Sequence, residues 1–231
     1  MRWFIALGLA AFVFAAISRI PLAWVGSHIQ TPPAVNPQYL GTIWKGAVTD
    51  IPGVAPVKFK TEALKLIGGK ALTFSSSSPG LTFSGDASLS QAVNIKVRGN
   101  MAALSKIENR LSGLEGDYNL VISDMKIGEV CERGEGSVST DILARNHANW
   151  QWRGPKLSGP IRCENGQIVI KMTGSESGQD FNSDLRLALD GNYRLTVDIK
   201  TADQRASLVL PIYGFEAAGG GFRLSEAGKW R

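Results

Sequence analysis

The chain has 231 residues, a formal net charge of +5 and only 19% charged residues. Its lysines and arginines are scattered, with no run of five like charges and no basic stripe between aromatic residues, so the composition argues against nucleic-acid binding. The 26 glycines and the low charge are typical of many short strands joined by turns. The length allows one β domain with a substantial core, or two small ones.

The N-terminal segment is apolar. Residues 3–18 carry no charge and would span roughly 24 Å as a helix, slightly less than a hydrocarbon core of about 30 Å. Apolar residues continue after Arg19, whose side chain can snorkel, so that Trp3 and Trp24 would lie near opposite interfaces. We predict an uncleaved transmembrane anchor over residues 1–25. A cleaved signal peptide and a buried soluble helix are the alternatives.

A proline-containing linker is predicted over residues 26–37 and a β-rich domain over residues 38–231. In this domain, apolar and polar residues alternate along successive short segments, which gives each segment one apolar and one polar face. The alternating positions include Leu81 and Phe83; Val93, Ile95 and Val97; Tyr118, Leu120 and Ile122; Val138, Thr140 and Ile142; Ile168, Ile170 and Met172; Leu185, Leu187 and Leu189; and Tyr193, Leu195, Val197 and Ile199. We predict a mainly β fold, a curved antiparallel sheet or sandwich-like domain.

Turns and one helix are also predicted. The dipeptides that indicate hairpin turns are Gly85-Asp86, Gly99-Asn100, Asn165-Gly166 and Asp190-Gly191, because these residues tolerate positive φ. Apolar residues at Met101, Leu104, Ile107 and Leu111 have helical spacing, and Asn100 can cap that segment. We therefore expect one short amphipathic helix after Asn100.

The sequence has two cysteines, Cys131 and Cys163. They are too far apart for a Cys-x-x-Cys redox motif, and neither has partners at metal-ligand spacing. In an exported chain such a pair favours a disulfide, which would close a loop of about 30 residues and stabilise the fold by roughly 3 to 4 kcal/mol. Two buried thiols are the alternative.

No combination of residues indicates catalysis. The histidines are His28, in the linker, and His147, in a polar turn, and neither has an apolar setting that would tune it. The glycine run at residues 219–221 lacks the lysine and hydroxyl residues of a phosphate loop and is predicted to be a turn between the last two strands. We expect no enzymatic activity, no cofactor and no metal.

Three elements of the sequence resemble the type II secretion system protein N family. The first is Gly41-Thr42-Ile43-Trp44-Lys45-Gly46, shortly after the linker. The second is the stretch 134–174, which contains Trp150, Trp152, Gly159 and Cys163, and the third is residues 208–230. Family members typically begin their periplasmic region with Gly-Thr-aliphatic-Trp-x-Gly. The sequence departs from the family pattern between residues 54 and 80, where a tryptophan-rich strand is usual.

The Gly-Thr-Ile-Trp-Lys-Gly element is interpreted as a tight strand. Gly41 and Gly46 would allow turns at its two ends, and Trp44 would bury its ring as an anchor of the sheet. The alternative interpretation is a docking surface for a partner subunit.

The resemblance implies an accessory, single-pass subunit of the inner membrane whose bulk lies in the periplasm. It would support the machine that exports folded proteins across the outer membrane, and its partners would be the inner-membrane platform subunits and the secretin. The alternative function is lipid handling by an anchored protein with an open apolar β-groove. An apolar slot open to solvent would favour lipid handling, whereas a face filled by Trp150, Trp152, Phe215 and Phe222 would favour a closed scaffold.

Overall fold

The computed structural model of the chain describes residues 21–23, 37–50, 54–61, 70–90, 92–106, 112–150 and 152–229. The strands are β1 (Gln38–Gly41), β2 (Lys45–Thr49), β3 (Val57–Lys60), β4 (Lys70–Ser78), β5 (Leu81–Ser88), β6 (Ala92–Asn100), β7 (Asp117–Ile127), β8 (Cys131–Thr140), β9 (Leu157–Glu164), β10 (Gln167–Glu176), β11 (Gln179–Leu187), β12 (Asn192–Lys200), β13 (Glu216–Ala218) and β14 (Gly221–Lys229). The helices are α4 (Met101–Leu104), α5 (Ile142–Arg145), α6 (His147–Trp150), α7 (Gln204–Val209) and the 3-10 helix η2 (Leu210–Tyr213).

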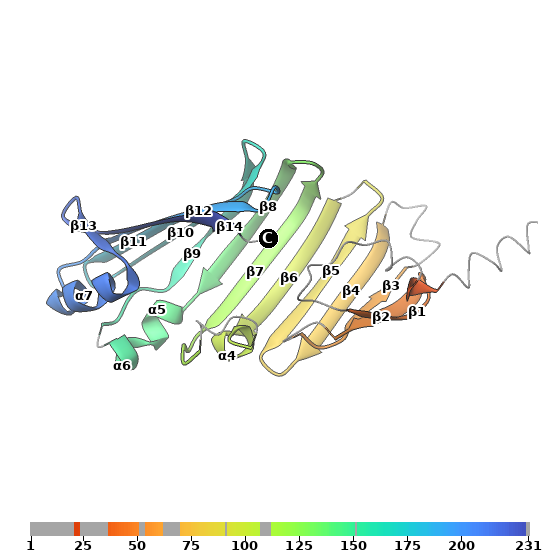
Figure 1. Cartoon of the computed structure of the whole chain (residues 1–231), viewed down its shortest axis with the longest axis horizontal. Coiled ribbons are helices and arrows are strands. Elements are labelled where there is room, and N and C mark those ends of the chain that lie inside the picture. Colours follow the sequence, from red (N-terminus) through yellow and green to blue (C-terminus); the bar gives the residue numbers. More distant parts are fainter. Residues whose placement is uncertain are drawn as a thin grey trace, which may run out of the picture.

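These strands form one curved antiparallel sheet (Figure 1). Strands that follow one another in the sequence pair side by side from β1 to β12. The order then becomes β12-β14-β13, because α7 and η2 intervene and the last hairpin returns with β14 against β12. The predicted mainly β, curved antiparallel fold is confirmed. The described residues contain a single sheet, so the sandwich-like form is not what the chain adopts there.

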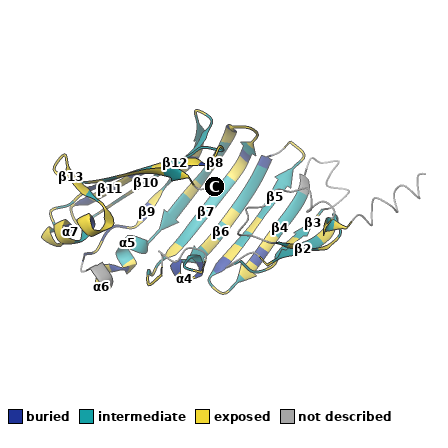
Figure 2. Ribbon diagram, viewed as in Figure 1, coloured by how far each residue is buried: buried dark blue, intermediate teal, exposed yellow. Residues whose placement is uncertain are grey.

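The register places one apolar row across twelve strands. Directly opposed residues share a face of the sheet, and successive pairs connect β1 to β12. The row consists of Gly41, Gly46, Phe59, Phe74, Gly85, Ile95, Ile122, Gly136, Ile161, Ile170, Leu185 and Leu195. One face is therefore apolar from β1 to β12, and the other carries mostly lysine, arginine, serine, threonine and asparagine. Figure 2 shows the resulting alternation of exposed and half-buried bands along the strands.

Glycines lie opposite aromatic rings at several points of the apolar face. A Cβ built on Gly85 would collide with the ring of Phe74, and one built on Gly99 would collide with Tyr118. Gly46 and Gly228 have the same relation to Phe59 and Tyr193. Each ring covers a bare stretch of neighbouring backbone, an arrangement that suits a curved sheet.

The C-terminal half of the apolar face is closed by a core. Its buried residues are Trp152, Leu157, Phe181, Val197, Ile199, Ala206 and Leu210, and Leu143, Phe215 and Phe222 pack against them. Trp152 is 2% exposed and Ala206 is fully buried, so α7, η2 and the segment before β9 form the layer over β9–β14. The side chain of Trp150 lies outside the described residues.

The N-terminal half of the same face carries no comparable layer among the described residues. Phe59, Phe74, Val97, Leu120 and Ile122 are half-buried and do not belong to the closed core. In Figure 1, α4 lies at the ends of the strands near β6 rather than across their middle, and α7 lies at the far end of the sheet. Large side chains therefore fill the C-terminal half of the apolar face, as expected of a closed scaffold. The described residues leave the N-terminal half without a covering layer, as expected of a lipid-handling protein.

The turn predictions had mixed outcomes. Asn165-Gly166 forms the β9–β10 turn and Asp190-Gly191 lies between β11 and β12, as predicted. The prediction for Gly85-Asp86 was wrong: both residues lie inside β5, where Gly85 makes room for the Phe74 ring. Gly99-Asn100 ends β6 and leads into α4 instead of forming a hairpin turn.

The predicted helix is present and short. The Asn100 side chain accepts a hydrogen bond from the Ala103 N–H (3.0 Å) and so caps α4, which ends at Leu104. The remaining predicted positions, residues 107 and 111, lie outside the described residues. Ile142, expected in a strand, begins α5 instead, directly after the end of β8.

The predicted membrane anchor falls mostly on residues outside the described part of the chain. These include Trp3, Arg19, Trp24 and nearly all of the linker. Among the described residues, no helix has both the length and the apolar character needed to cross a bilayer.

Candidate functional site

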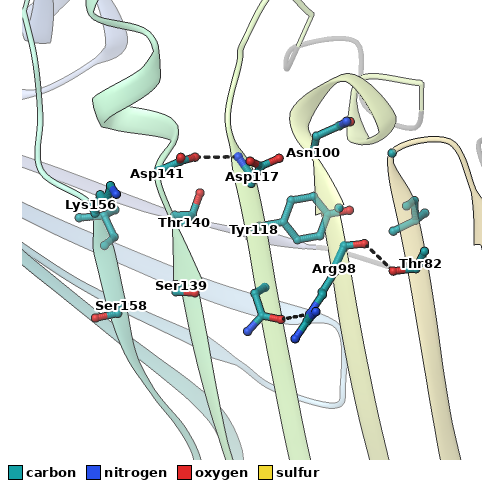
Figure 3. A pocket seen from close by; sticks show the side chains of 15 residues that line it. Thr82, Arg98, Asn100, Asp117, Tyr118, Ser139, Thr140, Asp141, Lys156 and Ser158 are labelled. Atoms are coloured by element: carbon teal, nitrogen blue, oxygen red, sulfur yellow. Dashed lines mark hydrogen bonds between the residues drawn. The ribbon is translucent and has the colours of Figure 1, made fainter.

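A hollow of about 750 Å³ lies at one end of strands β5 to β9 (Figure 3). A row of directly opposed polar residues crosses it from strand to strand: Thr82, Arg98, Asn119, Ser139 and Ser158. The Arg98 guanidinium donates to the Asn119 side-chain oxygen (3.2 Å), and the Thr82 hydroxyl donates to the Arg98 carbonyl (3.4 Å). This polar row forms one part of the lining, and Leu81, Tyr118 and Leu157, from the apolar face, form another.

Two carboxylates and one arginine fix the rim of this hollow. Asp141, just before α5, accepts hydrogen bonds from the Asp117 backbone N–H (2.7 Å) and from Arg145 Nε (3.0 Å). Burial of Asp141 opposes its ionisation, but these two hydrogen bonds outweigh that effect and hold the pKa of Asp141 below its ordinary value. The ionised carboxylate therefore ties the start of β7 to α5.

A buried asparagine makes a second tie between the same two segments. Asn146, 1% exposed, donates to the carbonyls of Glu115 (2.6 Å) and Ile142 (2.7 Å) and accepts from the Glu115 N–H (2.9 Å). Its amide replaces strand pairing for the chain that enters β7. The sequence analysis did not identify Asn146, because nothing in a polar loop distinguishes a structural asparagine from a solvated one.

Tyr118 lies in the wall of the hollow beside Gly99 (Figure 3). Its hydroxyl is buried and has no hydrogen-bond partner among the described residues. Burial raises the pKa of this phenol, which is therefore neutral at pH 7. The lining contains serine, threonine, aspartate, arginine and lysine side chains but no histidine or cysteine. These side chains can donate and accept hydrogen bonds at the hollow.

The motif that begins the domain forms a turn. Gly41 ends β1 with φ +88°, Thr42 to Trp44 form the bend, and Lys45 starts β2. The tight-strand interpretation was wrong, because Gly41 pairs directly with Gly46 across a hairpin. Trp44 is half-buried rather than a core anchor, and its carbonyl accepts from the Thr61 N–H (2.8 Å).

A disulfide joins Cys131 to Cys163, with their Cα atoms 5.5 Å apart. Cys131 begins β8, and Cys163 lies near the end of the neighbouring strand β9. In the same strand, a Cβ on Gly159 would overlap the Lys171 carbonyl of β10, so glycine is required there by close approach of the backbones. Both features brace the sheet where its closed half begins.

A protein-family model described as type II secretion system (T2SS), protein N matches residues 38–225. The chain belongs to this family. The match begins at the first residue of β1 and ends within β14, so it covers all of the sheet except the last residues of β14. No curated protein and no solved structure matches the chain.

Family membership assigns the chain to the machinery of type II secretion. The structure does not gather the residues singled out from the sequence into one site. The hairpin of Gly41, Thr42, Trp44 and Gly46 lies at the β1 end of the sheet, whereas Trp152, Gly159 and the disulfide lie in the region of β8 to β10. These residues form turns and close contacts in separate parts of the sheet.

Proposed function

We propose that this protein is an accessory, non-catalytic subunit held in the inner membrane by one N-terminal helix, with its sheet in the periplasm. The family match over residues 38–225 is the observation that carries the proposal. The disulfide between Cys131 and Cys163 supports an oxidising compartment for the sheet. The apolar sequence of residues 3–18 supports the anchor.

Its role is that of a tethered scaffold for the platform subunits and the secretin. An anchor keeps the sheet near the membrane, so that encounters with other anchored subunits occur at high effective concentration. The outer edge of the sheet offers a docking element: β13 pairs only with residues 221–223 of β14, and among the described residues no strand pairs with the outer edge of β14 beyond Arg223. An extended segment of a partner can add to this edge through backbone hydrogen bonds.

Photo-crosslinking in cells tests this role. A photoreactive residue at Ser225, exposed on the β14 edge strand, is expected to crosslink to another subunit of the secretion machine. The same residue at Thr173, exposed in the middle of the sheet on β10, is the matched control and is expected to give no crosslink. Unimpaired secretion in cells lacking the protein, together with no crosslink from Ser225, would refute the proposal.

The half of the apolar face that the described residues leave without a covering layer favours lipid handling as a second candidate. Half-buried apolar residues on β3 to β8 form a continuous surface, while Trp152, Phe215 and Phe222 fill the other half. Uptake of a fluorescent fatty acid by delipidated protein tests this candidate. A Val97→Asp substitution should abolish uptake by placing a charge on the apolar face, whereas Lys96→Asp, on the opposite face, should not. Absence of uptake by the unmodified protein would eliminate this candidate.

A further inference from the structure

The positive charge of the chain is concentrated in its first strands. Residues 37–106 contain eight lysines and arginines against three carboxylates, whereas residues 107–231 contain fifteen against seventeen. Beyond the N-terminal segment, the basic balance of the protein therefore comes from the region of β1 to β6. Such an asymmetry between two parts of a chain indicates a polyanionic partner for the basic part.

The register gathers these cations on the polar face. Lys58, Ser75, Ser84 and Lys96 are directly opposed in succession on β3, β4, β5 and β6. With strands about 4.8 Å apart, the two lysines flank the two serines across roughly 14 Å. We call the set Lys45, Lys58, Lys60, Lys96 and Arg98 the lysine surface; all five residues are exposed.

Two adjacent hollows lie within the lysine surface. One, of about 400 Å³, is lined by Lys45, Lys58 and Lys60, and the other, of about 390 Å³, by Lys96 and Arg98. Ser75 and Ser84 line both hollows. Ammonium, guanidinium and hydroxyl groups around a shallow hollow provide donors for an oxyanion such as a phosphate.

The cations elsewhere on the sheet are largely neutralised by carboxylates. Every ion pair between described residues joins positions after Gly116, such as Arg223 with Asp198 and Lys171 with Glu164. Within the described part of the chain, neither Lys58 nor Lys96 has a carboxylate partner. Both side chains are exposed, so their charges face solvent.

The position of the apolar N-terminal run decides which anionic surface is near. Pro21, which follows this run, forms an isolated antiparallel β-bridge with Thr42. Thr42 lies in the β1–β2 turn, three residues before Lys45. Pro21 is thus paired with the turn that leads into the strands carrying the lysine surface. If the run is in a bilayer, these strands lie next to the lipid headgroups.

We infer that the lysine surface docks onto anionic phospholipid headgroups of the membrane and orients the sheet relative to the bilayer. This inference rests on the anchoring in the proposed function. Headgroup phosphates accept hydrogen bonds from the lysines and from the serine hydroxyls between them. The balanced charge of β7–β14 leaves that end of the sheet free of the membrane. Attraction to an anionic membrane weakens roughly fivefold for each cation removed near the surface.

A distance measurement on the full chain in nanodiscs tests the inference. The native cysteines are bonded to each other, so a nitroxide can be attached to a single new cysteine at Ser75, with Ser225 on β14 as the comparison site. Nickel-chelating lipid in the headgroup layer should relax the Ser75 label in bilayers containing phosphatidylglycerol, and much less in phosphatidylcholine alone. The Ser225 label should be unaffected in both.

Charge-neutralising variants provide the matched control. Lys58→Gln with Lys96→Gln should lower the docked fraction relative to the undocked fraction about 25-fold. Lys200→Gln with Lys229→Gln, at exposed positions on the same face of β12 and β14, removes the same charge and should change nothing. Equal relaxation of Ser75 in both lipids, or equal loss in both variant pairs, would overturn the inference. Unchanged relaxation of the Ser75 label in the Lys58→Gln, Lys96→Gln variant, combined with loss of that variant's crosslinks to a secretion subunit, would also overturn the inference. That result would assign the lysine surface to an acidic protein.

Failure of the anchor gives a different result from failure of docking. A chain that does not enter nanodiscs refutes the anchor, and flotation with preformed vesicles then judges the lysine surface alone. Flotation that needs phosphatidylglycerol and is lost in the Lys58→Gln and Lys96→Gln variant supports docking. Flotation that is absent, or independent of phosphatidylglycerol, overturns it.

Discussion

Removal of the Cys131–Cys163 disulfide is expected to lower the free energy of unfolding by about 3 to 4 kcal/mol. The cysteines are 32 positions apart, and a cross-link over a loop of that length removes about this much chain entropy from the unfolded state. The loop also contains α5, α6 and Trp152, which is 2% exposed in the closed core. The bond therefore restrains the segment that covers the C-terminal half of the sheet.

Urea unfolding of the full chain in detergent measures this effect. With a slope of about 2 to 3 kcal/mol per molar urea for a domain of this size, the midpoint should fall by about 1 to 2 M on reduction. The six tryptophans report the transition. The Cys131→Ala, Cys163→Ala variant, whose midpoint should not respond to reductant, is the control. An unchanged midpoint after complete reduction would refute the reasoning, and two free thiols in protein isolated from cells would refute the bond itself.

Three further substitutions test packing and charge. Gly159→Ala should lower the free energy of unfolding by about 3 kcal/mol in the same urea assay, because the added Cβ meets backbone atoms. Gly128→Ala should be nearly neutral, because its added Cβ meets only the end of the flexible Glu132 side chain. Trp152→Ala should lower the free energy of unfolding by about 3 to 5 kcal/mol. Trp152→Phe should lower it clearly less, because phenylalanine also removes a buried N–H that has no partner among the described residues. Thermal unfolding would rank the two variants. The depressed pKa of Asp141 means that its ionised form stabilises the fold at neutral pH and that this contribution is lost as the pH falls below about 3.9 toward the folded-state pKa. Asp141→Asn should therefore be less stable than the wild type at pH 7, with the difference shrinking in acid; a difference independent of pH would contradict this assignment.

Alternation was sufficient to locate most strands of the sheet. The pairs Leu81–Phe83 and Val93–Val97 lie on β5 and β6 with their side chains on one face, because a two-residue period and one apolar face determine which way each residue points. Asn165-Gly166 was equally predictable, since both residues have positive φ in the β9–β10 turn.

Local signals failed where a distant strand supplied the reason. Gly85-Asp86 has the composition of a turn, but Gly85 is needed inside β5 because the Phe74 ring of β4 occupies the space of a side chain. The motif from Gly41 to Gly46 has strand-like residues at its centre, yet the pairing of its two glycines closes a hairpin. In both cases the role of glycine depends on which residue lies opposite, and that requires the register.

The candidate site was inaccessible to sequence reasoning for the same physical reason. Thr82, Arg98, Asn119, Ser139 and Ser158 come from five strands and share no motif. Only the pairing of each strand with the next places them in one row. The lysine surface depends on register in the same way, since a slip of one residue on β6 would move Lys96 to the apolar face.

The two halves of the sheet differ in what covers the apolar face and in what neutralises the charges of the polar face. In the C-terminal half, Trp152 and α7 cover the apolar face, and pairs such as Arg223 with Asp198 neutralise the polar face. In the N-terminal half, the described residues provide neither a covering layer nor carboxylates for Lys58 and Lys96. An apolar surface and unpaired cations both gain free energy from contact with something outside the chain. The half that follows the apolar N-terminal run is therefore the half for which we propose membrane contact, while the distal half supplies the closed core and the open β14 edge proposed for a partner.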